Sequence, residues 1–173
     1  MKTKPVNKVL LSAALLLTSA LGVASAGGAA APTVGGSTGQ IQAATPNSVA
    51  AALREAGYKV TVNPANPDED PSLSVTAGDY EIDVWFSNCK GNVCTRVTAS
   101  SYWDYSDDED ALDVELTNEW NGNYYTQAYI YEGSYYLDTT MVIAGGYTKT
   151  ALKAWMTEYL DDVSTFEESL DEE

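Results

Sequence analysis

Residues 80–102 decide the fold of this chain, and their sequence is YEIDVWFSNCKGNVCTRVTASSY. Every second residue from Tyr80 to Phe86 is apolar, which predicts a strand with one buried side. A loop bounded by two cysteines turns the chain into a second strand over 94–102, with Val97 and Ala99 facing inward. This pattern predicts antiparallel strands with one face packed on a core and the other exposed.

The exposed side of this predicted hairpin carries an unusual residue, Trp85. A tryptophan in the middle of a sheet is costly to leave in water, so its presence there indicates a contact surface. We therefore predict a candidate binding face for a protein or peptide, with a homodimer as a second option. The face consists of Glu81, Asp83, Trp85, Arg96 and Thr98.

The rest of the chain supplies further strands and three helices. A helix from Thr45 to Gly57 precedes strands over 58–62 and 73–76, and a second helix follows the central hairpin at 112–120. A hairpin with its turn at Glu132-Gly133 and a long amphipathic helix capped by Thr148 complete the chain. The order α-β-β-β-β-α-β-β-α predicts an α+β fold, a mainly antiparallel sheet with helices packed on one face.

The first 26 residues have the pattern of a cleaved export signal. Lys2, Lys4 and Lys8 precede an apolar run over 9–23, and Ala24-Ser25-Ala26 forms a signal-peptidase site. We expect cleavage after Ala26, a periplasmic or secreted protein, and no stable membrane anchor afterwards. The mature chain then divides into a flexible linker (27–44), one domain (45–170) and an acidic tail (171–173).

The charge balance restricts the partners. The full chain has 9 Lys and Arg against 25 Asp and Glu, a net charge of −16. Loss of the three signal-peptide lysines changes this net charge to −19. Nucleic acids and anionic membranes repel such a surface, whereas a basic protein or peptide is attracted to it.

The two cysteines, Cys89 and Cys94, are predicted to form a structural disulfide, because export places them in an oxidising compartment. A redox pair more typically has two intervening residues, and four are present. The chain contains no histidine, so we predict no zinc site and no Ser-His or Cys-His catalytic pair. No catalytic residue, metal or cofactor is assigned.

Two weaker patterns remain open. An EF-hand register would place ligands at Asp104, Ser106, Asp108, Asp110 and Glu115, but Glu109 stands where the loop requires glycine. Twelve tyrosines, several of them within 124–136, favour packing on a half-buried sheet, with stacking on sugars or peptide side chains as the alternative.

Five motifs stand out over about 45–170: Leu116-Thr117-Asn118-Glu119-Trp120-Asn121, Ala128-Tyr129-Ile130, Gly145-Gly146-Tyr147-Thr148, Ala56-Gly57-Tyr58, and the pair Asn88-Cys89 with Cys94. Together they resemble the YbjN domain family, and the cysteine motif resembles that of its exported members. Basic residues that usually follow the first motif are replaced by residues 122–125. The resemblance implies a fold similar to type III secretion chaperones and a role labelled sensory transduction regulator, with no established catalytic residues. The most specific motif is Asn118-Glu119-Trp120-Asn121. We expect Trp120 to lie in the core, and we expect the side chains of Asn118, Glu119 and Asn121 to form hydrogen bonds at the helix-to-strand junction.

Taken together, the sequence predicts a non-enzymatic extracytoplasmic module that binds a protein or peptide and is chaperone-like or regulatory. A carbohydrate- or cation-binding envelope protein is the alternative. A hydrolase that uses a carboxylate pair is the least favoured reading.

Overall fold

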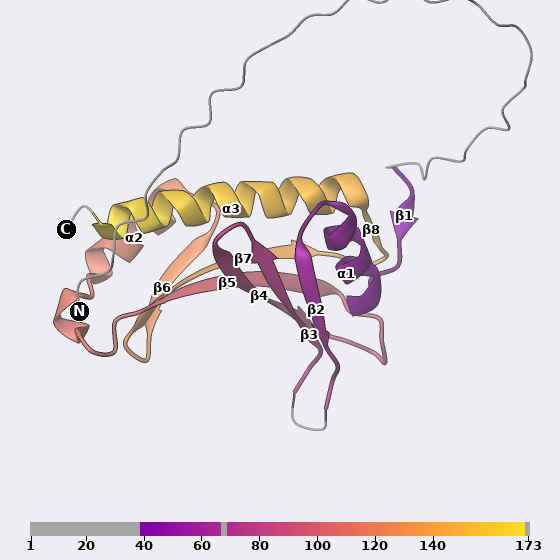
Figure 1. The fold of residues 1–173 in the computed structure, drawn as a ribbon, viewed down its shortest axis with the longest axis horizontal. Helices are drawn as coiled ribbons and strands as arrows, with labels where there is room; N and C mark the ends of the chain where they lie inside the picture. Colours follow the sequence, from indigo (N-terminus) through magenta and orange to yellow (C-terminus); the bar gives the residue numbers. More distant parts are fainter. Residues whose placement is uncertain (1–38, 67–68, 172–173) are drawn as a thin grey trace, which may run out of the picture. The chain divides into compact units, whose positions relative to one another are not determined.

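A six-stranded antiparallel sheet forms the centre of the computed structural model, which describes residues 39–66 and 69–171 (Figure 1). Across the sheet the strands follow the order β2 (Lys59–Asn63), β3 (Ser72–Ala77), β4 (Tyr80–Ser87), β5 (Arg96–Asp104), β7 (Ser134–Val142) and β6 (Gln127–Tyr131). The helices are α1 (Pro46–Glu55), α2 (Val114–Asn123) and α3 (Lys149–Asp171). The predicted α+β class is confirmed, and the main elements follow the predicted order.

Three short elements were not expected. Strand β1 (Ile41–Gln42) pairs with β8 (Tyr147–Thr148), and a 3₁₀ turn (Glu109–Ala111) precedes α2. Because of this turn, α2 begins at Val114 rather than at Leu112, and Asp113 caps it by accepting a hydrogen bond from the Glu115 amide at 2.7 Å.

Side-chain caps start the other two helices where the sequence places them. The Thr45 hydroxyl accepts from the Ser48 amide at 3.2 Å, and Pro46 occupies the first turn of α1. The Thr148 hydroxyl accepts from the Ala151 amide at 3.1 Å at the start of α3. Each cap satisfies a backbone donor that has no partner within its own helix.

Helix α3 covers one face of the sheet (Figure 1). Its Tyr159 hydroxyl donates to the Leu137 carbonyl oxygen at 2.8 Å and hydrogen-bonds with the Ser101 hydroxyl at 2.9 Å. Tyr159 is buried, and that burial raises its pKa well above the ordinary range. Further along α3, Phe166 packs against the rings of Trp103, Trp120 and Tyr135.

One edge of the sheet is protected by a side chain of α1. The Arg54 guanidinium donates from Nε and Nη2 to the Val60 carbonyl oxygen of edge strand β2, at 3.2 and 2.7 Å. Occupied edge carbonyls discourage pairing with a strand of another molecule.

The expected signal peptide and the linker up to residue 38 lie outside the described residues, as do residues 172 and 173. Residues 39–44, however, are not a featureless linker, because β1 forms there and Ala44 is buried. The Ala44 carbonyl oxygen also accepts a hydrogen bond from the Cys94 amide at 2.8 Å. The ordered domain therefore starts a few residues before Thr45. At its other end, Asp171 belongs to α3 rather than to the tail.

The packing of β1 depends on Gly146. This residue has φ +109°, and a Cβ atom there would lie 2.6 Å from the Gln42 carbonyl oxygen. We therefore expect Gly146→Ala to lower the free energy of unfolding by about 2 kcal/mol or more, through both backbone strain and a clash with backbone.

Gly122 provides the matched control. It lies within α2, and a Cβ there would meet nothing within 4 Å. Gly122→Ala should raise stability by about 0.5–1 kcal/mol, because alanine favours a helix over glycine. Urea denaturation followed by circular dichroism measures both, and equal effects of the two substitutions would contradict the account of Gly146.

Candidate functional site

The helices leave the second face of the six-stranded sheet uncovered among the described residues. Strand alternation sends Ile82, Val84, Val97, Ala99 and Leu137 into the core beneath the helices. Their neighbours along each strand point the other way. We call this surface the open face. Its members on β4 to β7 are Glu81, Asp83, Trp85, Ser87, Arg96, Thr98, Ser100, Tyr102, Asp104, Gln127, Tyr129, Tyr131, Ser134, Tyr136, Asp138, Thr140 and Val142. Lys59 of β2 also lies on it, in register with Thr76 and Glu81.

All five residues of the predicted binding face lie on the open face. Trp85 pairs across the strands with Thr98 and is 41% exposed. Arg96 is exposed and lies two residues before Thr98 on β5. Glu81 accepts a hydrogen bond from the Thr76 hydroxyl at 3.1 Å. Their position agrees with the alternation, while their role in binding stays a prediction.

A row of stacked tyrosines extends the open face beyond what the sequence analysis assigned. Tyr102, Tyr136 and Tyr129 lie side by side on β5, β7 and β6. Their ring centroids are 5.8 Å (Tyr102 to Tyr136) and 5.3 Å (Tyr136 to Tyr129) apart, and the ring planes are nearly parallel. Tyr131 approaches Tyr136 edge-on at 6.3 Å. The alternation of residues within 129–136 could have predicted from the sequence that Tyr129, Tyr131 and Tyr136 share a face. Only the strand register shows that Tyr102 belongs to the same row.

The tyrosines of 124–136 do not form one surface. Tyr135 enters the core, and Tyr124 stacks on Trp120 with a centroid distance of 3.8 Å. Tyr125 is fully exposed. Some of these rings therefore pack in the core and others are exposed on the open face, while stacking on sugars or peptide side chains stays a prediction.

Two aspartates flank a serine on the open face. The register pairs Ser100 with Asp83 on one side and with Asp138 on the other. Asp138 Oδ2 accepts from the Tyr129 hydroxyl at 3.1 Å, whereas the buried Oδ1 receives no hydrogen bond of regular geometry from the described residues.

The surroundings of these aspartates change their proton affinity. Partial burial raises the pKa of Asp138, and the nearby hydroxyls of Ser100 and Tyr129 oppose that rise. Partial burial, followed by the charge of Glu81, raises the pKa of Asp83. Burial, with the negative charge of Asp138, raises the pKa of Tyr129 to about 12. The two aspartates therefore hold negative charge where they are only partly solvated. A cation placed beside them would be stabilised.

The acidic segment before α2 has a structural role. The Asp104 carboxylate accepts from the Ser106 amide at 2.9 Å, and hydrogen bonding to the Ser106 side chain, followed by that to its backbone, lowers the Asp104 pKa. Asp113 caps α2. Within residues 39–66 and 69–171, no group of three or more Cys, Asp or Glu side chains is arranged to hold a metal ion.

The motif Asn118–Asn121 divides into two pairs. Trp120 is buried, and its indole Nε1 donates to the Thr126 hydroxyl at 2.9 Å, which in turn donates to Asp162 Oδ2 of α3. Asn121 exchanges two hydrogen bonds, both 2.8 Å, with the backbone of Ala128 on β6. These contacts join α2 to the sheet as expected.

The other two motif residues differ from the expectation. Asn118 and Glu119 are exposed, and neither side chain hydrogen-bonds to another described residue. Glu119 faces away from the junction because residues two positions apart on a helix, such as Glu119 and Asn121, point to different sides. The side chains of Asn118 and Glu119 border a shallow hollow beside α2 instead.

The predicted cysteine pair is brought together between β4 and β5. A disulfide joins Cys89 and Cys94. Cys94 is fully buried. The loop between them makes a small antiparallel bridge, Lys90 with Val93.

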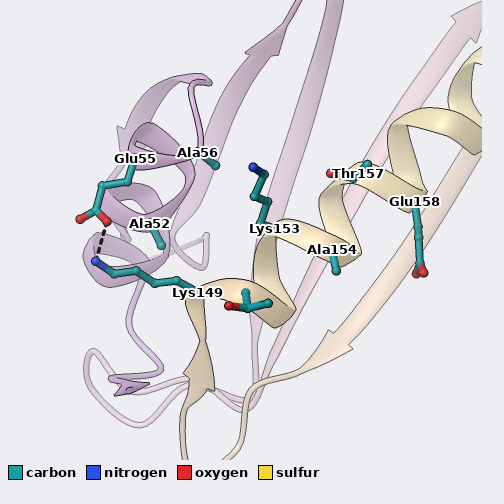
Figure 2. Close-up of a pocket in the computed structure, with 9 residues that line it drawn as sticks. Ala52, Glu55, Ala56, Lys149, Lys153, Ala154, Thr157 and Glu158 are labelled. Atoms are coloured by element: carbon teal, nitrogen blue, oxygen red, sulfur yellow. Dashed lines mark hydrogen bonds and ion pairs between the residues drawn. The ribbon is translucent and has the colours of Figure 1, made fainter. Parts of the chain in front are cut away.

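A separate hollow lies on the helical side of the domain, between α1 and the start of α3 (Figure 2). Its volume is about 580 Å³. Lys149 of α3 pairs with Glu55 of α1 at its rim. This hollow was not anticipated, because residues 52–56 and 149–158 are far apart in the sequence.

The fold and the open face define a class of protein: an α+β domain in which helices cover one face of an antiparallel sheet and leave the other free. Residues 45–172 match the family model of YbjN, whose description is "Putative bacterial sensory transduction regulator". The chain belongs to the YbjN family. No curated protein matches the chain.

A solved structure has a similar fold. It is the "Crystal structure of an uncharacterized protein from Methanothermobacter thermautotrophicus", with a TM-score of 0.51 and 14% identity. The match covers 70% of this chain and 93% of that chain. At this identity the likeness concerns the fold alone. No helix in the described part of the chain is long and apolar enough to cross a membrane.

The raised pKa of Asp138 predicts how the stability of an Asp138 variant should change with pH. A carboxyl whose pKa is higher in the folded than in the unfolded protein favours folding only when protonated, and that contribution is lost as pH rises through the folded-state pKa. Asp138→Asn should therefore raise the melting temperature at pH 7 by a few degrees, and the gain should shrink towards pH 3.

Asp107→Asn is the control, because it removes one exposed negative charge from the same protein. Thermal melts of both variants and the parent between pH 3 and pH 7 make the comparison. A stabilisation by Asp138→Asn that is independent of pH, or one matched by Asp107→Asn, would contradict the assignment.

Proposed function

We propose that this YbjN protein is a non-enzymatic binding module that acts outside the cytoplasm and engages a protein or peptide through the open face of its sheet. The single observation that carries this proposal is the concentration of exposed aromatic side chains on a rigid surface. Trp85 is 41% exposed and Tyr102 is 60% exposed, both in central strands. Tryptophan and tyrosine contribute a large share of the energy of protein interfaces.

The chemistry of the open face favours a basic partner. Its carboxylates are Glu81, Asp83, Asp104 and Asp138, whereas Arg96 and Lys59 are its basic residues. An arginine or lysine side chain next to Asp83 and Asp138 would gain a charge partner and could lie against an aromatic ring. The net charge of the whole chain acts in the same direction and would speed association with a basic partner.

Two alternatives are less well supported by this geometry. Sugars stack on the flat face of an aromatic ring, but the faces of Tyr136 are occupied by Tyr102 and Tyr129. A hydrolase could use Asp83 and Asp138 as a carboxyl pair, since both have a raised pKa. However, both residues lie on a sheet surface outside the hollows beside α1 and α2, and a substrate would remain accessible to water.

A site-specific crosslink tests the proposed surface. The photoreactive residue p-benzoylphenylalanine placed at Trp85 should yield an adduct with the partner in the intact envelope, because the position lies centrally on the open face. The same residue placed at Asp161, which is exposed on α3, is the control. Gel electrophoresis and mass spectrometry detect the adduct and identify its components.

The outcomes are distinguishable. An adduct formed at Trp85, absent at Asp161 and lost when Tyr102→Ala is added supports the proposal. An adduct of two copies of this chain would identify the open face as a dimer interface instead. The absence of any adduct at Trp85, or equal adducts at both positions, would overturn the proposal.

The extracytoplasmic location is supported by the pattern of residues 1–26 and by the cysteine pair, which is stable as a disulfide in an oxidising compartment. We expect the mature protein to begin at Gly27. Intact-mass spectrometry of the protein from the envelope or medium should give the mass of residues 27–173 less two hydrogen atoms for the disulfide. Recovery of the full-length chain from the cytoplasm would contradict the location.

A further inference from the structure

The hollow between α1 and α3 has apolar walls. Three alanines form them, Ala52 and Ala56 of α1 and Ala154 of α3 (Figure 2). Small side chains on both helices leave a volume of about 580 Å³, within the range of about 300–1,000 Å³ typical of small-molecule sites. The Glu55–Lys149 ion pair joins the two helices at the rim of the hollow.

Two lysines stand along this hollow, in a protein with few basic residues. Lys149 and Lys153 lie one turn apart on the side of α3 that borders α1, and they account for two of the nine Lys and Arg in the full chain. Lys149 belongs to the first turn of α3, where the helix dipole favours negative charge over positive charge. A negatively charged ligand would therefore be favoured at this end of α3.

The two lysines differ in their partners. Lys149 is neutralised by Glu55, whereas Lys153 forms no ion pair with any described residue. In Figure 2 the Lys153 side chain extends toward Ala56, and Glu158 lies at the other end of the hollow. An anion held by Lys153 would therefore sit beside the alanine-lined wall and away from the carboxylate of Glu158.

We propose that this groove binds a monomeric anionic amphiphile, an aliphatic chain with a single carboxylate head. The carboxylate pairs with the Lys153 ammonium, and the aliphatic chain lies against Ala52, Ala56 and Ala154. The site is on the helical side of the domain and uses no residue of the open face. It is independent of the proposed partner binding.

A free amphiphile fits this groove better than a membrane surface does. The net charge of −16 repels an anionic bilayer, because the bilayer presents many negative charges to the whole protein surface. A single carboxylate responds mainly to the nearby Lys153, because more distant charges are screened. An aliphatic chain also matches walls made of methyl groups, since burying it removes apolar surface from water.

Isothermal titration with decanoate below its micelle concentration tests the proposal on the mature protein. Lys153→Glu should weaken decanoate binding by about tenfold or more, because it removes a charge-assisted hydrogen bond and adds repulsion. Lys90→Glu is the matched control: it makes the same charge change on the exposed cysteine loop and should alter affinity by less than about twofold. Decanol, with the same chain and no charge, should bind more weakly than decanoate.

A second pair of variants tests the apolar wall. Ala154→Phe fills the groove from an exposed helix position and should also weaken binding, whereas Ala151→Phe, exposed on the same helix outside the groove, should not. Affinity should rise from hexanoate to octanoate to decanoate, as the buried chain lengthens. Circular dichroism confirms that each variant is folded.

Equal decanoate affinity in the parent, Lys153→Glu and Ala154→Phe would overturn the proposal. So would binding that appears only with vesicles of anionic phospholipid, since that result would identify a membrane surface as the ligand.

Discussion

The rest of the structure depends on the contact between α3 and one face of the sheet. Tyr159 joins α3 to β5 and β7 by hydrogen bonds at the centre of the core, and Phe166 gathers the rings of Trp103, Trp120 and Tyr135 at the far end. A sheet residue is on either the α3 side or the opposite side, because side chains alternate along a strand. The cover provided by α3 thus defines the open face.

The open face combines features that a purely structural surface does not require. A tryptophan, three stacked tyrosines and two partly desolvated aspartates lie on neighbouring strands. Half-buried carboxylates and exposed aromatic rings both cost free energy in water, and a cationic, partly apolar partner would relieve both costs. The family description of a sensory regulator is compatible with such a partner, and the uncovered sheet is where we propose that it binds.

The helical side of the domain presents a different chemistry. The groove between α1 and α3 has alanine walls and holds Lys149, which is paired with Glu55, and Lys153, which forms no ion pair with a described residue. We propose that Lys153 receives an anionic head group there, whereas the open face receives a basic partner. Because the groove shares no residue with the open face, the two proposed ligands would not compete.

The sequence by itself determined the fold class, the helix caps at Thr45 and Thr148, the inward and outward residues of β4 and β5, and the cysteine pair. These features depend on local spacing, which is legible along the chain. Only the tertiary structure decided the strand order β5-β7-β6, which aligns Tyr102 with Tyr136 and Tyr129 and places Ser100 between two aspartates. It alone also brought α1 beside α3, and it paired residues 41–42 with residues 147–148. Long-range pairing depends on packing of the whole core, which no local pattern encodes.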